Sequence, residues 1–154
     1  MDILKIILIS AAPLSEQRLA IYLGIHTYEL DPILVMIFSF LGSLLPVPFI
    51  LFFFNIIFEW MKRFKFFRII NNYIENKLDR GSKKIEKYKE IGLIILVAIP
   101  LPTTGLWTGS AVAAFLKLDI KKSFMYIAIG GVISAVVITI LSVTFPSFVK
   151  SWVH

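Results

Sequence analysis

The sequence contains no cysteine and only two histidines, His26 and His154. Without cysteine there can be no disulfide and no thiolate metal ligand, and the histidines lie too far apart in sequence to form a ligand pair. A glycine-rich phosphate loop, a His or Cys nucleophile with its base, and paired carboxylates within the apolar segments are also missing. We therefore expect a protein with no cofactor, no metal site and no enzymatic activity.

Charge is scarce as well, and it is unevenly distributed. Charged residues make up 17% of the chain, the net charge is +6, and ten of the sixteen Lys and Arg lie between Lys62 and Lys89. The basic character thus belongs to one segment, 59–90, and not to a nucleic-acid-binding surface. Aromatic and basic residues alternate there with helical spacing, which predicts an amphipathic helix on the anionic cytoplasmic leaflet. The residues expected to contact lipid headgroups are Lys62, Arg63, Lys65 and Arg68.

Apolar residues are abundant, since 58% of the chain is hydrophobic and 14% aromatic. Four stretches are each as long as the roughly 20 residues that a membrane-spanning helix needs: 3–25, 32–58, 91–116 and 123–146. We expect an all-α, multi-pass integral protein of the cell (cytoplasmic) membrane, with one membrane domain over residues 1–154.

Two of these stretches are interrupted. The first contains Pro13 and a pair of opposite charges near its middle, and the third contains Pro100 and Pro102 followed by Gly105. Prolines remove backbone donors and glycine permits a reversal, so each stretch is expected to break inside the membrane. Each arm has about a dozen residues, or about 18 Å of helix, which reaches the middle of a hydrocarbon core about 30 Å thick.

The distribution of lysines distinguishes two topologies. If segment 91–116 crossed the membrane, the lysine-rich connection 117–122 would lie outside, against the positive-inside rule. If that segment is a re-entrant hairpin, the connection stays in the cytoplasm. The first reading gives four simple spans; the second gives two halves of opposite orientation, each a hairpin followed by a spanning helix, as in many secondary transporters.

Glu16 and Arg18 are the sharpest functional signal. An isolated charge at membrane depth costs at least about 2.5–3.5 kcal/mol and persists where it is buried, paired or functional. On an unwound tip the two side chains are expected to converge, with Arg18 binding an anion, Glu16 exchanging a proton and Ser15 beside them. The alternative is an ion pair that only braces the fold.

Polar residues follow the second break. Helix N-termini favour anions and hydroxyl groups cap them, so these residues are expected at the substrate or at the helix cap: Thr103, Thr104, Trp107 and Thr108. Pro46 and Pro48 predict a further kink, which shapes the second segment around the first hairpin or acts as a hinge.

Three motifs carry a resemblance to a known family. They are Pro-x-Ser-Glu-x-Arg at 13–18, Leu-Pro-Val-Pro-Phe at 45–49, and Ile-Pro-Leu-Pro-Thr-Thr-Gly-Leu-Trp-Thr-Gly at 99–109. Together they resemble the putative small multidrug export protein family over nearly the whole chain. The chain departs from that pattern at Thr103, where relatives more often have glycine, and after Arg18, where relatives often continue toward a proline.

A more distant likeness, of architecture more than of sequence, is to the DedA-type membrane proteins. It implies two re-entrant hairpins face to face, with Glu16 and Arg18 corresponding in kind to the acid and base at their tips, and a role in moving lipid phosphates. The arginine expected on the second hairpin has no counterpart here.

The sequence thus favours a proton- or ion-coupled secondary transporter or lipid-phosphate flippase, working as a homodimer or larger assembly, with an anionic substrate group between the two tips. One alternative is an exporter of cationic drugs, with Glu16 binding the cation. Another is a non-transporting scaffold that recruits anionic lipid or protein through its basic segment.

Overall fold

The protein is described by a computed structural model that covers residues 1–12, 16–61, 83–100, 105–116, 118–147 and 149. Within these residues the regular structure is entirely helical, which confirms the expected all-α class. The first half contains α1 (Asp2–Ala11), α2 (Glu16–His26), α3 (Pro32–Leu44) and α4 (Pro46–Met61). The second half contains α6 (Lys83–Ala98), α7 (Leu106–Phe115) and α8 (Ile120–Thr144).

Aspartate side chains cap the two long apolar helices. Asp31 accepts hydrogen bonds from the backbone N–H groups of Ile33 (2.9 Å) and Leu34 (3.2 Å), and Pro32 follows it at the first helical position. Asp119 likewise accepts a hydrogen bond from the backbone N–H of Lys122 at 2.9 Å. An aspartate at this position satisfies the orphan donors of the first turn and complements the helix dipole. Both helix starts are therefore fixed by local sequence.

The second apolar segment is not one continuous helix. α3 ends at Leu44, Leu45 forms a turn, and α4 begins at Pro46. Pro46 and Pro48 have no N–H to offer the carbonyls of Gly42 and Leu44, so the ladder of helical hydrogen bonds is interrupted there. The backbone N–H of Leu45 is shared between the carbonyls of Leu41 and Gly42, each at 3.3 Å. The expected spanning helix 32–58 is thus two helices joined at a bend.

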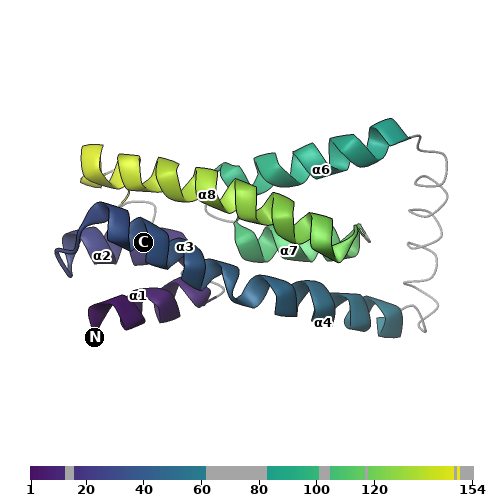
Figure 1. Cartoon of the computed structure of the whole chain (residues 1–154), viewed down its shortest axis with the longest axis horizontal. Helices are drawn as coiled ribbons and strands as arrows, with labels where there is room; N and C mark the ends of the chain where they lie inside the picture. Colours follow the sequence, from purple (N-terminus) through teal and green to yellow (C-terminus); the bar gives the residue numbers. More distant parts are fainter. Residues whose placement is uncertain (13–15, 62–82, 101–104, 117, 148, 150–154) are drawn as a thin grey trace.

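The short helices fold back on their neighbours (Figure 1). α1 and α2 pack against each other and against α3, whereas α6 and α7 pack against α8. A Cβ atom at Gly24, near the end of α2, would lie 2.5 Å from the Ile6 side chain in the middle of α1, so these two helices pack closely. Figure 1 shows the α1–α2 pair at one end of the molecule and the α6–α7 pair toward the other.

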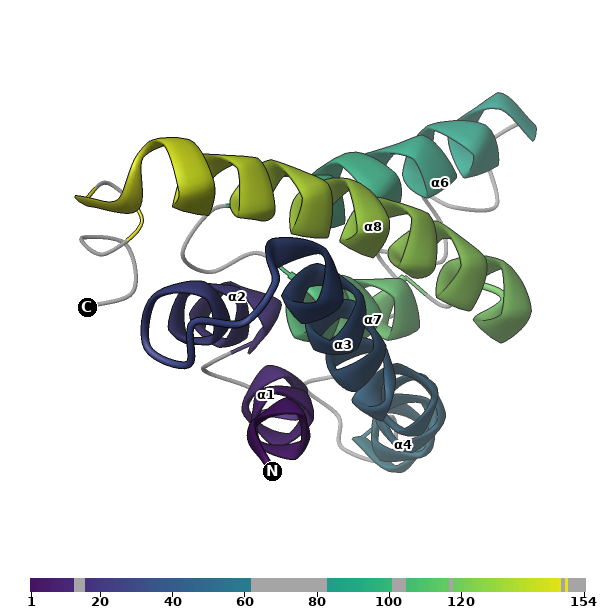
Figure 2. The same ribbon diagram turned by 60° about the vertical axis from the view of Figure 1, so that its left-hand side comes forward.

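Helix α8 joins the two ends, because it runs past both groups of short helices (Figures 1 and 2). Ala135 and Ile138 of α8 belong to a buried cluster with Ile6, Ile21 and Val35. Its Ile127 belongs to a second cluster, which contains Val47, Leu51, Leu93, Val97, Leu106 and Ala113. The α8 helix is therefore the common wall of both cores.

Two stretches of helix are long and apolar enough to cross a membrane, by length and composition: Pro32–Phe53 and Ile120–Thr144. Large apolar side chains lie exposed along both, among them Leu41, Leu45, Phe49, Ile133 and Ile140. Surfaces of this kind are costly in water and suit the hydrocarbon of a bilayer. The second stretch begins three residues before the expected start at 123 and ends two before 146.

Candidate functional site

The two breaks in the helices lie next to each other. The indole N–H of Trp107, the second residue of α7, donates to the backbone carbonyl of Ala11, the last residue of α1, at 3.2 Å. A carbonyl in the last turn of a helix has no helical donor of its own, so the indole satisfies it. The end of α1 and the start of α7, which are 96 residues apart in sequence, therefore meet inside the molecule.

The charged motif of the first break lies at the start of a helix. Glu16, Gln17 and Arg18 form the first turn of α2. Residues 16–18 are therefore helical and not part of an unwound tip. The convergence of the Glu16 and Arg18 side chains stays a prediction. The side chain of Glu16, like residues Pro13 and Ser15, lies outside the part of the chain that the structure describes.

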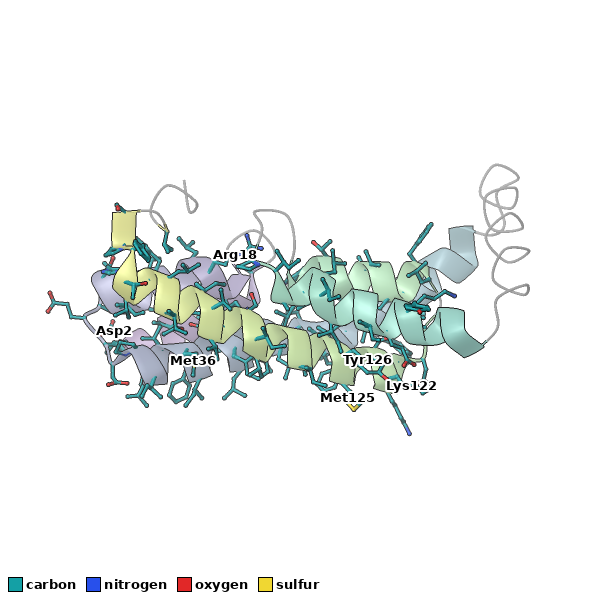
Figure 3. All side chains as sticks on the ribbon, turned by 90° about the horizontal axis from the view of Figure 1, so that it is seen from above. Asp2, Arg18, Met36, Lys122, Met125 and Tyr126 are labelled. Carbon is teal, nitrogen blue, oxygen red and sulfur yellow. The ribbon has the colours of Figure 1, made fainter. Side chains whose placement is uncertain are left out.

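Arg18 lies between the two ends of the molecule along its long axis. Its side chain is half-buried, and Figure 3 shows it between Asp2, near one end, and Lys122, toward the other. It belongs to the first turn of α2, where the helix dipole is positive, and a cation at that place is disfavoured unless an anion accompanies it. The first turn of α2 thus combines the positive end of the helix dipole with the cationic side chain of Arg18.

Gln17 is the largest buried polar side chain of this region, with 2% of its surface exposed. Its Nε2 donates to the carbonyl oxygen of Gly131 in α8 at 3.3 Å, and its Oε1 accepts a hydrogen bond from the Ser43 hydroxyl at 3.4 Å. The same hydroxyl lies 2.9 Å from the carbonyl of Phe40, one turn earlier in α3. Gln17 thus joins α2, α3 and α8, a role that the sequence analysis missed.

Buried serines surround this connection. The Ser10 hydroxyl donates to the carbonyl of Ile7 at 2.9 Å, and the Ser110 hydroxyl donates to the carbonyl of Leu106 at 2.6 Å. Among the described residues, the Ser39 hydroxyl is buried and has no hydrogen-bond partner. Small serines at helix interfaces let the helices of a membrane protein pack closely.

The second break is described only at its edges. Pro100 is half-buried and ends the segment that contains α6, while Gly105 is buried and precedes α7. The φ angle of Gly105 is 169°, which is extended backbone open to any residue, so the chain reverses without a left-handed glycine there. Thr108 lies half-buried in α7. Pro102, Thr103 and Thr104 lie outside the described residues.

Small residues let α7 approach α6 closely. A Cβ atom at Gly109 would collide with Val97 of α6, and Ala113, four residues later, is fully buried. This is the backbone-to-backbone packing that small residues at four-residue spacing permit. Gly109 and Ala113 therefore act in packing.

Each interrupted segment, 3–25 and 91–116, has a contact between a residue near its beginning and a residue just after its end. Glu90, just before the segment 91–116, lies 3.6 Å from the Lys122 ammonium and accepts a hydrogen bond from the Tyr126 hydroxyl at 2.7 Å. At the other end, the Lys5 ammonium lies 5.3 Å from the centroid of the Tyr28 ring. Lys5 also pairs with Asp2 at 2.9 Å, and this contact holds the pKa of the Asp2 carboxyl below its ordinary value.

The basic residues assigned to lipid headgroups lie outside the described residues: Lys62, Arg63, Lys65 and Arg68. The last part of the basic segment 59–90 is helical, because α6 begins at Lys83 and continues into the segment 91–116. Among the residues described, no group of three or more His, Cys, Asp and Glu side chains is placed to hold a metal ion.

Comparison with known proteins gives one match. The model of a family described as "Putative small multi-drug export protein" matches residues 16–137. No curated protein and no solved structure matched the chain.

Proposed function

Because the chain belongs to the family described as "Putative small multi-drug export protein", we propose that it is a secondary-active membrane transporter whose substrate binds where the two helix breaks meet. The observation that carries this proposal is the hydrogen bond from Trp107 to Ala11, because it links the two breaks into one region. Discontinuous helices that meet near the bilayer midplane are the usual construction of transporter sites.

The proposed topology has two hairpins that enter from opposite faces. The contact of Glu90 with Lys122 supports a segment 91–116 that enters and leaves on one side, and the contact of Lys5 with Tyr28 supports the same for segment 3–25. With α3–α4 and α8 as the spanning elements, the two halves form an inverted repeat. The membrane is the cell membrane, and the lysine-rich segment lies on its cytoplasmic face.

In this proposal the substrate group is anionic, as in a lipid phosphate. Arg18 supports an anion because it stands in the first turn of α2, where the positive end of the helix dipole adds to its charge. Glu16, in the same turn, exchanges the coupling proton, and hydroxyls of Thr104 and Thr108 line the opposite tip. The protein performs no chemical reaction on its substrate.

The chain functions as a homodimer in this proposal. The structure describes seven helices, of which α1, α2, α6 and α7 belong to the two hairpins. So few elements enclose a pathway for a substrate only with help from a second copy.

Reconstituted vesicles with a pH gradient test the proposal, using a fluorescent phosphatidic acid as the anionic probe. Arg18→Ala is expected to lower its translocation at least about tenfold, since a charge-assisted hydrogen bond contributes about 1.5–3 kcal/mol. Glu16→Gln is expected to abolish the response to the pH gradient. If both variants behave like the wild type, the proposal is wrong.

The family description itself favours a second candidate, an exporter of cationic drugs. Here Glu16 binds the cation and Arg18 only balances its charge. Ethidium in the same vesicles separates the two candidates, because a cation exporter would move ethidium and lose this activity in Glu16→Gln. Arg18→Ala would then leave ethidium transport in place.

A further inference from the structure

A groove lies at the bend between α3 and α4, outside the polar region described above. It has a volume of about 410 Å³ and is bounded by α1, by the α3–α4 junction and by α8. Figure 2 shows α1 and α4 on either side of the lower part of α3. The side chains that form its walls are Ile7, Leu41, Leu45, Pro48, Phe49 and Phe124.

The groove is a consequence of the sequence at the bend. Pro46 and Pro48 interrupt the hydrogen-bond ladder at Leu45, so α4 leaves in a new direction and no longer continues the surface of α3. On the other side, α1 is held against Gly42, where a Cβ atom would lie 2.6 Å from the carbonyl oxygen of Ile7. The bend and the tight α1–α3 contact together leave the space open.

The position of the groove indicates that membrane lipid, and not water, surrounds it. It lies near the middle of the stretch Pro32–Phe53, which is long enough to span a membrane. Its wall residues Leu41, Leu45 and Phe49 are 48%, 58% and 64% exposed, although all are large and apolar. Among the residues that the structure describes, only apolar ones and Gly42 line the space, so they offer no partner to an ion or a strongly hydrated group.

The size and lining of the groove fit a hydrocarbon chain. Its volume of about 410 Å³ lies within the roughly 300–1,000 Å³ of small-ligand sites, and its described walls offer only apolar contacts. At this place in a membrane-spanning stretch, the hydrocarbon of the bilayer is the neighbouring apolar phase. We propose that the groove binds a hydrocarbon chain of a membrane amphiphile.

The groove adjoins the polar region through α3. Gly42 lines the groove, and the next residue, Ser43, donates its hydroxyl to Gln17, the neighbour of Arg18. A molecule with its chain in the groove thus has its polar group within the same layer of the protein as the start of α2. This makes an amphiphile, and not a wholly water-soluble compound, the substrate class, a step that rests on the proposed transport function.

Photolabelling in vesicles tests the groove directly. The probe is phosphatidylglycerol with a diazirine in its acyl chain, applied to the full chain without any ion gradient, and labelled residues are located by peptide mass spectrometry. We expect the groove residues to take up several times more label than Ile37, which is 44% exposed on α3 outside the groove. Leu41→Trp, which fills the groove, is expected to lower labelling several-fold.

Ile37→Trp is the matched control, because it adds the same bulk at similar exposure one turn away, and it should leave labelling of the groove unchanged. Leu45→Trp provides a second filling variant if Leu41→Trp does not fold. Two results overturn the inference. One is equal labelling of all exposed apolar residues, and the other is groove labelling that neither Leu41→Trp nor Leu45→Trp lowers. An unlabelled groove covered by a second copy of the chain overturns it as well.

The two proposals fail separately. Because no gradient is applied, a protein that binds the chain but transports nothing would still show groove labelling, and only the proposed transport function would fall. Transport of the phosphatidic acid probe by a protein whose groove remains unlabelled would overturn the groove alone.

Discussion

The Lys122 ammonium lies 3.6 Å from Oε1 of Glu90, so the residues that flank the segment 91–116 meet at one end of the molecule. Glu90 also accepts a hydrogen bond from the Tyr126 hydroxyl at 2.7 Å, which ties α6 to α8 at the same place. A segment whose two ends touch cannot have them on opposite faces of a membrane. The contact therefore leads to a prediction about topology.

Single-cysteine labelling is the direct measurement of this prediction, since the chain has no native cysteine. In intact cells, Tyr88→Cys and Lys121→Cys should both be protected from a membrane-impermeant maleimide, and Glu29→Cys should react. All three positions are exposed at the ends of the molecule. The cysteine-free parent is the blank. Tyr88 and Lys121 on opposite sides would show that segment 91–116 crosses the membrane.

Gln17 is expected to be the polar residue on which stability depends most. Gln17→Ala removes the side-chain donor to the Gly131 carbonyl and leaves the Ser43 hydroxyl with the Phe40 carbonyl alone, which costs about 1–3 kcal/mol in the free energy of unfolding. Ser43→Ala should lower the free energy of unfolding less, because the contact of the Ser43 hydroxyl with Gln17, at 3.4 Å, is the longer of the two Gln17 hydrogen bonds.

A double-mutant cycle in detergent, followed by denaturation with SDS, measures this connection. The coupling between Gln17 and Ser43 should be about 0.6 kcal/mol, the average for side-chain hydrogen bonds inside membrane proteins. Strictly additive effects would mean that the 3.4 Å contact contributes nothing, and that Gln17 acts through Gly131 alone.

The sequence predicted the helical class and the places where helices are interrupted. The lengths of the apolar stretches predicted the membrane segments. The prolines predicted the bend at Leu45 and the breaks before α2 and α7. These features are local, because a missing backbone donor interrupts a helix whatever surrounds it. Positions of the breaks could therefore be read without knowledge of the packing.

The extent of the first break was misjudged. A serine directly before an acidic residue is a common helix start, and Ser15 with Glu16 gave that signal. Because of the two charges, the predicted break extended as far as Arg18, although α2 already begins at Glu16. Weighing the helix-start preference would have placed Arg18 in the first turn of α2.

The role of Gln17 was not predictable from local sequence. A glutamine between two charged residues resembles any polar position, and its burial depends on Gly131, 114 residues away. Glycine at 131 leaves room there, since a Cβ atom would lie 3.1 Å from the Phe40 ring. Contacts of this kind come from tertiary packing, which periodicity and composition do not contain.

Trp107→Phe is expected to separate the role of the indole N–H from that of the ring. The phenyl ring keeps much of the apolar contact but cannot donate to the Ala11 carbonyl, so the two breaks lose their direct hydrogen bond. The loss should be about 0.5–1.5 kcal/mol in unfolding free energy. Transport of the phosphatidic acid probe should fall more than stability alone explains.

Comparison with Ser110→Ala provides the control, because that hydroxyl bonds only within its own helix, to Leu106. Equal transport rates for Trp107→Phe and the wild type would mean that the hydrogen bond between the breaks is not needed for transport.

The close approach of α1 to α3 at Gly42 gives the sharpest test of the fold. A Cβ atom there would lie 2.6 Å from the carbonyl oxygen and 2.9 Å from the Cα atom of Ile7, and these backbone atoms cannot move aside as a flexible side chain would. Gly42→Ala should therefore push α1 away and destabilise the protein by about 1–3 kcal/mol, the usual cost of overpacking.

Gly92→Ala is the matched control, because nothing lies within 4 Å of its added methyl group. In that open position alanine should stabilise α6 by up to about 1 kcal/mol through its higher helix propensity. SDS denaturation of both variants measures the difference, and a Gly42→Ala protein as stable as the wild type would mean that α1 does not pack on α3 at this distance.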